Sequence, residues 1–160
     1  MSKENLHGVG GWLAFFIFST MVLSLVLGSG QLYGQFADVL DKHPRLAYNE
    51  RFNSMKSAYW YAFWFFYAIK FVSGYRLWKI HTWSSVTFAI KAMWFCIVGA
   101  AITNIAIAAA YVDSLPSEDI ASWLGQVTVS AFFGLLWTVY LLRSVRVRNT
   151  YPKLQPTVPN

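Results

Sequence analysis

The chain has 160 residues, of which 56% are hydrophobic and only 12% carry a charge, and its mean hydropathy is +0.40. Soluble domains carry roughly a quarter charged residues, so this composition indicates a protein of the lipid bilayer and excludes an ordinary soluble domain. The net charge of +6 does not indicate nucleic acid as a partner, because most lysines and arginines flank apolar stretches, as membrane orientation requires.

The length bounds the architecture. A chain of this size supplies about four spans of ~20 residues with their connections and leaves no room for a soluble domain. We therefore expect one all-α domain over residues 1–160, a polytopic membrane protein built as a four-transmembrane-helix bundle. The expected spans cover about 10–33, 57–77, 85–111 and 120–142, followed by a basic tail at 143–160.

The first span is the longest uncharged stretch. No Asp, Glu, Lys or Arg occurs between Glu4 and Asp38, which is ample for a ~30 Å hydrocarbon core. The stretch is longer than the core of a secretory signal, so we interpret it as a retained span. Beyond it, residues 35–56 mix charged and apolar residues around Pro44. Two interpretations stay open there: short helices lying on the membrane surface, or a plain solvated loop.

The second span contains an aromatic run interrupted by Lys70. The uncharged run between Lys56 and Lys70 holds thirteen residues, which at ~1.5 Å per residue make about 20 Å of helix, too short to cross. One of these two lysines must therefore lie within the span. The interfacial character of Arg76, Trp78 and Lys79 favours a span that includes Lys70.

Aromatic residues recur along this span at steps of three and four, which places them on one helical face. Such a stripe is typical of packing against neighbouring helices or lipid. The alternative is a wall that binds an isoprenoid, a quinone or an acyl chain. The stripe consists of Trp60, Trp64, Tyr67, Phe71, Tyr75 and Trp78.

A short connection after the second span predicts an antiparallel hairpin with the third. Lys91 lies about as far after this turn as Lys70 lies before it, so we expect both ammonium groups roughly 10 Å inside the helix ends. One interpretation is that both side chains snorkel toward water or headgroups. The other is a basic notch for the phosphate of an anionic lipid, with its chains along Trp64, Tyr67 and Phe71.

Small residues at helical spacing mark two faces in the third and fourth spans. In lipid, where apolar burial gives no net drive, such faces predict close helix contact, and Asn104 is expected to hydrogen-bond between helices. The predicted packing residues are Gly99, Thr103, Ala106 and Ala110 in the third span and Ser130, Gly134 and Thr138 in the fourth.

The distribution of basic residues predicts the orientation. With both termini inside, seven flanking Lys and Arg lie inside against four outside, and six of the seven acidic residues fall outside. The positive-inside rule then predicts N-in and C-in, with residues 35–56 as a long first periplasmic loop. In the tail, Arg143, Arg146, Arg148 and Tyr151 are expected to contact anionic headgroups, with a partner protein as the alternative.

Two short stretches resemble a bacterial family. Residues 8–13, GVGGWL, precede the first span, and Trp137-x-x-Tyr140 with residues 144–151, SVRVRNTY, ends the fourth. They are similar to the two ends of the YdgK-like inner-membrane proteins, domain-of-unknown-function family 2569. The resemblance implies about four spans and a bacterial inner-membrane location, and it implies no activity. The chain departs from the family at Val139, where members often carry a proline.

Catalysis fits the sequence poorly. His7, His43 and His81 lie in separate segments, and no nucleophile with a base or phosphate loop occurs, so we expect no enzyme, no cofactor and no metal site. The sequence predicts an accessory or binding subunit that associates with anionic lipid, with another membrane protein or with itself. The alternative is an oligomeric transporter or channel for an anion or amphipath, with Lys70 and Lys91 as its charged element.

Overall fold

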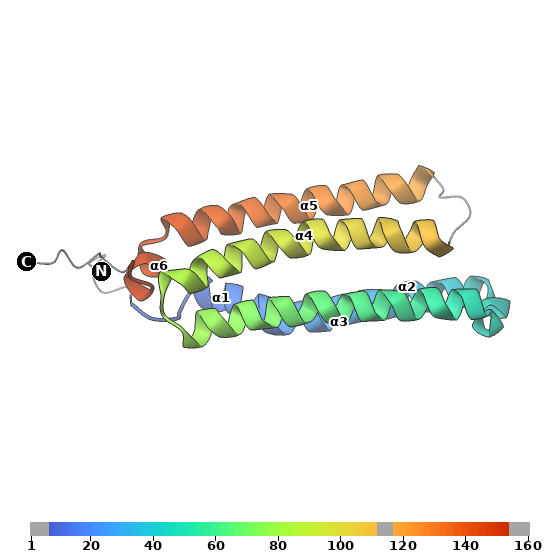
Figure 1. Cartoon of the computed structure of the whole chain (residues 1–160), viewed down its shortest axis with the longest axis horizontal. Helices are drawn as coiled ribbons and strands as arrows, with labels where there is room; N and C mark the ends of the chain where they lie inside the picture. Colours follow the sequence, from blue (N-terminus) through green and yellow to red (C-terminus); the bar gives the residue numbers. More distant parts are fainter. Residues whose placement is uncertain (1–6, 112–116, 154–160) are drawn as a thin grey trace, which may run out of the picture.

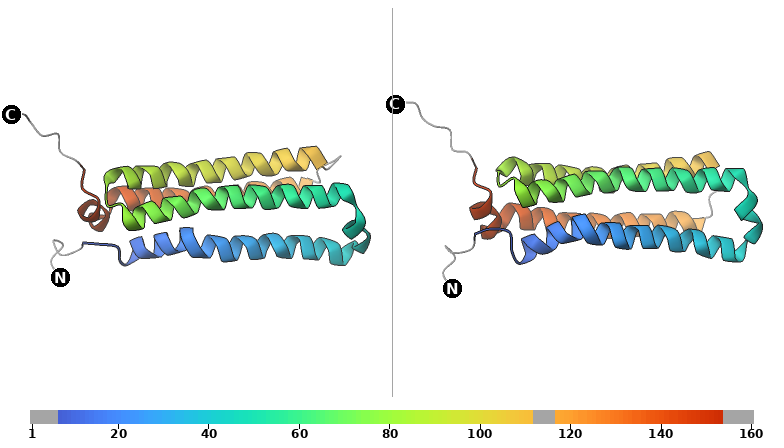
Figure 2. Two further views of the ribbon diagram at one scale, coloured as in Figure 1. Left: turned by 60° about the horizontal axis from the view of Figure 1, so that its bottom comes forward. Right: turned by 90° about the horizontal axis from the view of Figure 1, so that it is seen from below.

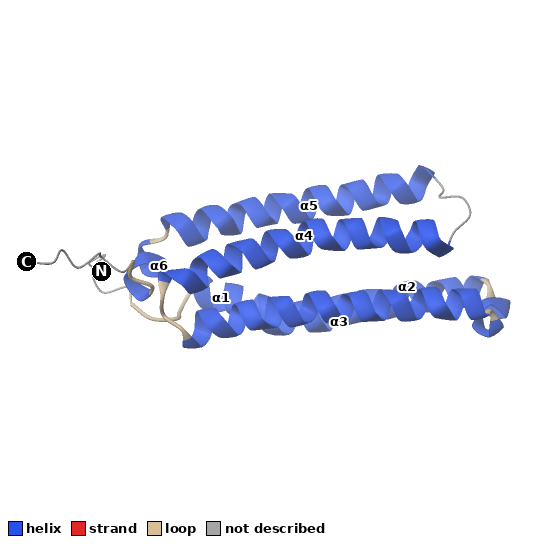
Figure 3. Cartoon of the chain, viewed as in Figure 1, coloured by secondary structure: helices blue, strands red, loops and turns tan. Residues whose placement is uncertain are grey.

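The computed structural model describes residues 7–111 and 117–153, and this part of the chain is helical with no strand (Figures 1 and 3). Four long rods run antiparallel. The first rod joins α1, η2 and α2 and leads through the 3₁₀ turn η3 to α3, while α4, α5 and the short α6 complete the chain. The bounds are α1 Trp12–Phe18, η2 Ser19–Leu23, α2 Ser24–Lys42, η3 Pro44–Tyr48, α3 Glu50–Lys79, α4 Trp83–Tyr111, α5 Ser117–Arg143 and α6 Val145–Thr150.

Three helical stretches are long and apolar enough to cross a membrane: Trp12–Lys42, Trp83–Tyr111 and Ala121–Arg143. The prediction of an all-helical membrane protein is confirmed at this level. The remaining rod, α3, has 30 residues, which is sufficient length, but it carries three lysines, two arginines and a glutamate. Whether α3 can be a fourth membrane span therefore depends on whether its charged side chains face lipid or the interior of the bundle.

Residues 35–56, expected to form either short surface helices or a solvated loop, are mostly extensions of the two neighbouring rods. α2 continues to Lys42 and α3 already begins at Glu50, so only the 3₁₀ turn and its flanking residues connect them. Asn49 explains the early start of α3, because its side chain accepts a hydrogen bond from the Phe52 N–H at 3.1 Å and caps the first turn. Phe52 also packs edge-on against Phe36 of α2, with ring centroids 6.0 Å apart.

The helices follow one another around the bundle in chain order. α3 packs against α2 and α4, and α5 packs against α4 and α6. α2 and α5 close the circle as neighbours (Figure 2), yet within the described residues they make no comparable contact. The seam between α2 and α5 is therefore the loosest part of the bundle.

The best-buried side chains gather at one end of the bundle, where α1 begins and α6 folds across the rods (Figure 1). We call this the terminal end. Its core joins residues of α1, α3, α4, α5 and α6, so five helices are fixed together here. The core cluster consists of Leu13, Phe16, Ile17, Leu77, Val86, Ala89, Leu141, Val147 and Tyr151.

Tyr151 differs from the expectation that it lies at the membrane interface. Its side chain is fully buried, and its hydroxyl donates a hydrogen bond to the backbone carbonyl of Leu77. The physical reason is the end of α3: Leu77 lies in the last turn, where carbonyls have no partner within the helix. The tail tyrosine supplies that partner, and headgroup contact through its ring is excluded by its burial.

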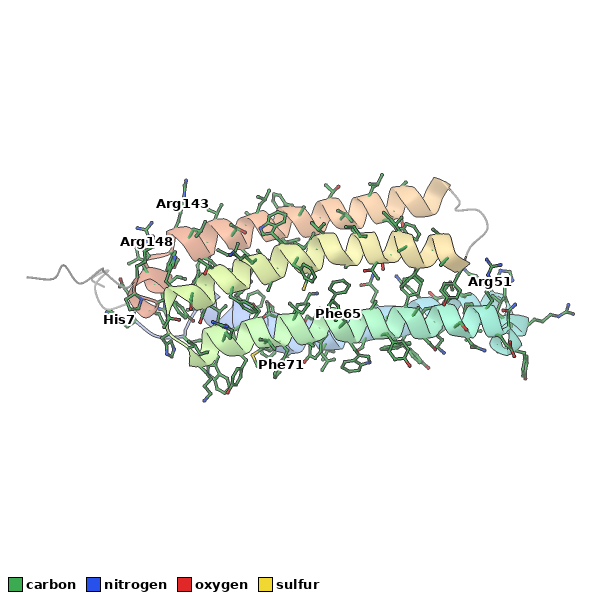
Figure 4. The ribbon with its side chains drawn as sticks, viewed as in Figure 1. His7, Arg51, Phe65, Phe71, Arg143 and Arg148 are labelled. Atoms are coloured by element: carbon green, nitrogen blue, oxygen red, sulfur yellow. The ribbon has the colours of Figure 1, made fainter. Side chains whose placement is uncertain are left out.

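The two end stretches singled out by resemblance meet in space. The Thr150 hydroxyl lies 3.3 Å from the Gly8 carbonyl oxygen, and the Arg146 guanidinium rests against Gly10, where a β-carbon would collide with it. Arg143 and Arg148 instead point away from the bundle at the terminal end (Figure 4). The tail thus ties the start of the chain to the core while two of its arginines stay exposed.

Candidate functional site

A π-helical turn, η2, interrupts the first rod beside α3. The hydroxyl of Thr20 donates to the carbonyls of Phe16 and Ile17, and Tyr67 of α3 donates its hydroxyl to the Met21 carbonyl at 2.9 Å. π-turns inside α-helices occur frequently at functional sites. Here the turn brings hydroxyl-bearing residues against α3 at the level where the interior of the bundle opens.

A cavity of about 560 Å³ lies inside the bundle between all four rods. This volume falls within the range of roughly 300–1,000 Å³ that small-molecule sites occupy. At the terminal end the cavity is closed by Phe16, Ala89 and Trp137. The rings of Phe16 and Trp137 pack together there, with centroids 4.8 Å apart. We call this closed end the floor.

Polar side chains gather near the floor. Lys70 and Ser73 line the cavity from one face of α3, and Ser19 and Thr20 line it from the π-turn region. Ser73 is only 3% exposed, and no hydrogen bond joins its hydroxyl to another described residue. None of the described residues that line this cavity carries a carboxylate. The floor therefore combines one ammonium group with hydroxyls and no counter-ion.

The rest of the cavity wall is largely apolar. Its side chains come from α4 and α5, and several of them are more than half exposed, including Ile105 at 57%, Leu124 at 63% and Phe133 at 54%. Cys96 lines the cavity as well, with its thiol 3.7 Å from the Phe66 carbonyl oxygen. The cavity thus has an apolar body with an accessible side wall.

A second cavity, of about 770 Å³, continues toward the turn between α2 and α3. It shares five lining residues with the first, so the two spaces adjoin: Lys70, Ala100, Asn104, Trp123 and Gln126. Its wall is more polar and includes Gln31, Gln35 and Asp38 of α2. The interior space therefore runs from the α2–α3 turn to the floor, with Lys70 on the wall of both parts.

The two lysines lie at similar depth but on different faces. The contact between Cys96 and Phe66 sets the register of the α3–α4 hairpin, and four residues further toward the turn this register places Lys70 opposite Ala92, next to Lys91. Lys91, however, is exposed and is not among the described residues that line either cavity. The structure does not gather the pair into one notch, and Lys70 alone faces the interior.

The aromatic stripe is also divided. Trp64 and Phe71 are 51% and 41% exposed on the outside of the bundle. Tyr67, between them in the stripe, lines the second cavity and is tied to Met21 through its hydroxyl. A ligand in the cavity would therefore touch Tyr67, whereas Trp64 and Phe71 face the surroundings of the protein.

Small residues bring helices together at three of the predicted packing positions. At Gly99 a β-carbon would lie 2.8 Å from the Phe66 ring, and at Gly134 one would lie 2.9 Å from the Ile97 side chain. Thr138 accepts a hydrogen bond from the Trp94 indole at 3.1 Å. The other predicted packing residues lie in the cavity walls or on the outside: Thr103, Ser130, Ala106 and Ala110.

Sequence reasoning missed the hydroxyl residues beside Lys70. Ser73 and Thr20 are far apart along the chain, and their meeting depends on how the first rod packs against α3. Gly74 was the available signal. A β-carbon there would lie 2.8 Å from the Thr20 hydroxyl oxygen, so a glycine inside an apolar helix marks this close approach.

Comparison with known proteins gives one match. A family model described as "Protein of unknown function (DUF2569)" matches residues 6–152, which include both end stretches and all the helices. No curated protein and no solved structure matches the chain.

Proposed function

The chain belongs to the DUF2569 family, and this match confirms the family resemblance of its two ends. On this premise we propose that the chain is a four-span protein of the bacterial inner membrane that binds an anionic amphipath. The ligand occupies the interior cavity with Lys70 as its counter-charge, and the protein catalyses no reaction. The YdgK-like name is not tested by the family match and stays a prediction.

The position of α3 supports four spans. α3 lies side by side with α2 and α4 along the bundle (Figures 1 and 2), and both neighbours belong to stretches of membrane-spanning length. The obstacle to counting α3 is its charge, because a lysine facing lipid costs at least ~2.5–3.5 kcal/mol at the bilayer centre. Lys70 faces the cavity instead, so α3 can cross with the others.

Charge at the two ends of the bundle supports termini inside. The terminal end carries basic side chains without acidic ones among the described residues, and the α2–α3 turn carries both signs. The positive-inside rule then places the terminal end in the cytoplasm. The basic residues of the terminal end are Arg76, Lys79, Arg143, Arg146, Arg148 and Lys153.

The observation that carries the binding proposal is the uncompensated charge of Lys70. A charge inside a membrane bundle is stabilised by a partner, and of the described lining residues none supplies a carboxylate in the first cavity, while Asp38 lines the adjoining one. An anionic group of a ligand would complete the site. Because the floor closes the cavity against the terminal end, the space has the form of a binding pocket rather than a through-path.

Native mass spectrometry tests the proposal with a matched pair of variants. Lys70→Met and Lys91→Met remove the same charge at similar depth, but only the first alters the cavity wall. We expect phosphatidylglycerol to bind roughly 10- to 100-fold more weakly to Lys70→Met, since a hydrogen bond to a charged group is lost, and to bind Lys91→Met normally. Equal affinity in wild type and both variants would contradict the proposal.

Transport is the second candidate, and the adjoining cavities favour it. Together they reach from the α2–α3 turn to the floor, which resembles a path open on one side and closed on the other. An oligomer that opened the floor would move an anion or amphipath past Lys70. Proteoliposome flux of a fluorescent fatty acid should then be lost in Lys70→Met and kept in Lys91→Met, and flux that survives Lys70→Met removes this lysine from the mechanism.

An accessory role in a larger membrane complex, or association with a second copy, is compatible with lipid binding. The exposed aromatic side chains of α3 offer an outer face for such contact. Affinity isolation from native membranes tests this role: a stoichiometric partner or a dimer supports it, and a bare monomer after gentle solubilisation opposes it.

A further inference from the structure

We infer that the ligand is an anionic membrane lipid drawn from the leaflet on the terminal side, with its charged group held near the floor and its acyl chain directed toward the α2–α3 turn. The inference rests on the proposed binding function and adds to it the source of the ligand and its direction in the cavity.

Polarity along the cavity carries the direction. By the register of the α3–α4 hairpin, Ser73 and Lys70 lie at the depth of Ala89 and Ala92, close to the floor. Ser19 and Thr20 also lie at this end, but their hydroxyls donate to backbone carbonyls of their own rod. Ser73 and Ser85 are buried, and neither hydroxyl has a hydrogen-bond partner among the described residues. Of the two, Ser73 lines the cavity, where beside an ammonium it is placed to donate to an anion.

Beyond these groups the wall turns apolar. Met93 and Ile97 of α4 and Val127 and Phe133 of α5 line the cavity before the neutral amides of Asn104 and Gln126 appear. Ala92 and Asn104 are twelve residues apart, a distance of about 18 Å along a helix. An acyl chain fits this apolar section.

The side wall points to the bilayer as the source. Ile105, Leu124 and Phe133 line the cavity and are more than half exposed, so this side of the cavity is accessible rather than packed against other helices. In a membrane, hydrocarbon surrounds the bundle at this depth. The loosely packed seam between α2 and α5 gives the route. The floor, by contrast, is sealed against the water of the terminal side by the core cluster.

The depth of Lys70 selects the leaflet. Nine residues separate Lys70 from Lys79 at the terminal end of α3, and twenty separate it from Glu50 at the other end. These separations correspond to about 14 Å and about 30 Å of helix. A lipid of the terminal-side leaflet has its head on that side and its chain toward the bilayer centre, so it enters the seam without turning over.

Photocrosslinking with two fatty acids tests the direction. One probe carries a diazirine next to the carboxylate and the other carries it at the chain end, and the full-length protein is labelled in phosphatidylglycerol bilayers. We expect the head-proximal probe to label Met93 and Trp137 near the floor and the chain-end probe to label Ile105 and Leu124. The reverse assignment overturns the direction while leaving binding intact, and adducts confined to the outer surface overturn the proposed function as well.

Two controls separate the sources of the anion. Acetate and glycerol phosphate share the charge but lack the chain, so at the concentration of the probe they should leave cavity labelling unchanged. Competition by either as strong as that of unlabelled oleate means that a free anion is bound, and the lipid inference fails. Lys70→Met should reduce cavity labelling at least tenfold and Lys91→Met should leave it unchanged, and equal labelling of the two variants contradicts the assigned headgroup contact.

Discussion

Replacing Tyr151 by phenylalanine tests how the tail holds the bundle. The substitution keeps the ring, which packs in the core cluster beside Leu13 and Val147, and removes only the hydroxyl. That hydroxyl donates to the Leu77 carbonyl, which lies in the last turn of α3, at a residue with 0% exposure. After the substitution this carbonyl has neither a helical partner nor access to water.

The size of the effect follows from the burial of the orphaned carbonyl. Leaving a buried acceptor unsatisfied costs about 1–3 kcal/mol, more than the ~1 kcal/mol net contribution of an ordinary hydrogen bond. For a chain of this size each kcal/mol corresponds to ~2–4 °C in melting temperature. We therefore expect Tyr151→Phe to melt about 2–12 °C below wild type.

Thermal unfolding in a mild detergent, followed by tryptophan fluorescence, measures this difference. Tyr48→Phe is the matched control, because Tyr48 is 92% exposed and its substitution should change the melting temperature by less than about 1 °C. If Tyr151→Phe is as stable as the Tyr48→Phe control, the tail does not satisfy the end of α3, and its place in the core would have to be reassigned.

Three further perturbations have defined outcomes in the same unfolding assay. Gly74→Ala should destabilise the folded protein by about 1–3 kcal/mol, because the added methyl group would overpack against the π-turn. Gly30→Ala, in open space on α2, should stabilise it by about 0.5–1 kcal/mol. Similar effects of the two substitutions would contradict the close approach of Gly74 to the π-turn. Burial raises the pKa of Tyr151 above its usual range, so its contribution is complete below about pH 10 and is lost as the pH rises beyond it; an equally steep alkaline loss in Tyr151→Phe refutes this. Thr138→Val combined with Trp94→Phe should show a coupling of about 0.6 kcal/mol or more, and strict additivity would argue against the interhelical bond.

The sequence was sufficient for the helices because their signal is local. The uncharged stretch before Asp38 and the apolar run through Cys96 each predict a membrane-length helix, and both are present. The run of only thirteen uncharged residues between Lys56 and Lys70 likewise predicted that one of these lysines lies within the helix, and α3 contains both. Their ends were less predictable, since the cap at Asn49 starts α3 ahead of its apolar section.

The site was only partly predictable because it depends on packing between distant segments. Periodicity places Trp64 and Tyr67 on one face of α3, but it does not say which neighbour covers that face. The same limit applies to the lysines: their equal distance from the turn fixed their depth, whereas the rotation of α3 and α4 decided that Lys70 faces the cavity and Lys91 does not.

The position of Tyr151 in the tail was likewise not predictable from local sequence. Basic residues after a last span are ordinarily headgroup anchors, and the exposed Arg143 and Arg148 fit that pattern. Nothing local distinguishes Tyr151 from an interfacial tyrosine, because its burial depends on an unsatisfied carbonyl in α3, 74 residues away in the sequence.

The reactivity of Cys96 tests the central claim most directly. This residue is the only cysteine in the chain, and it lines the cavity beside the proposed ligand although it is only 2% exposed. We predict that phosphatidylglycerol or oleate slows alkylation of Cys96 by a membrane-permeant maleimide in wild type and in Lys91→Met, and that this protection is lost in Lys70→Met. Protection that is absent from wild type, or that persists unchanged in Lys70→Met, would contradict an anionic amphipath bound at Lys70.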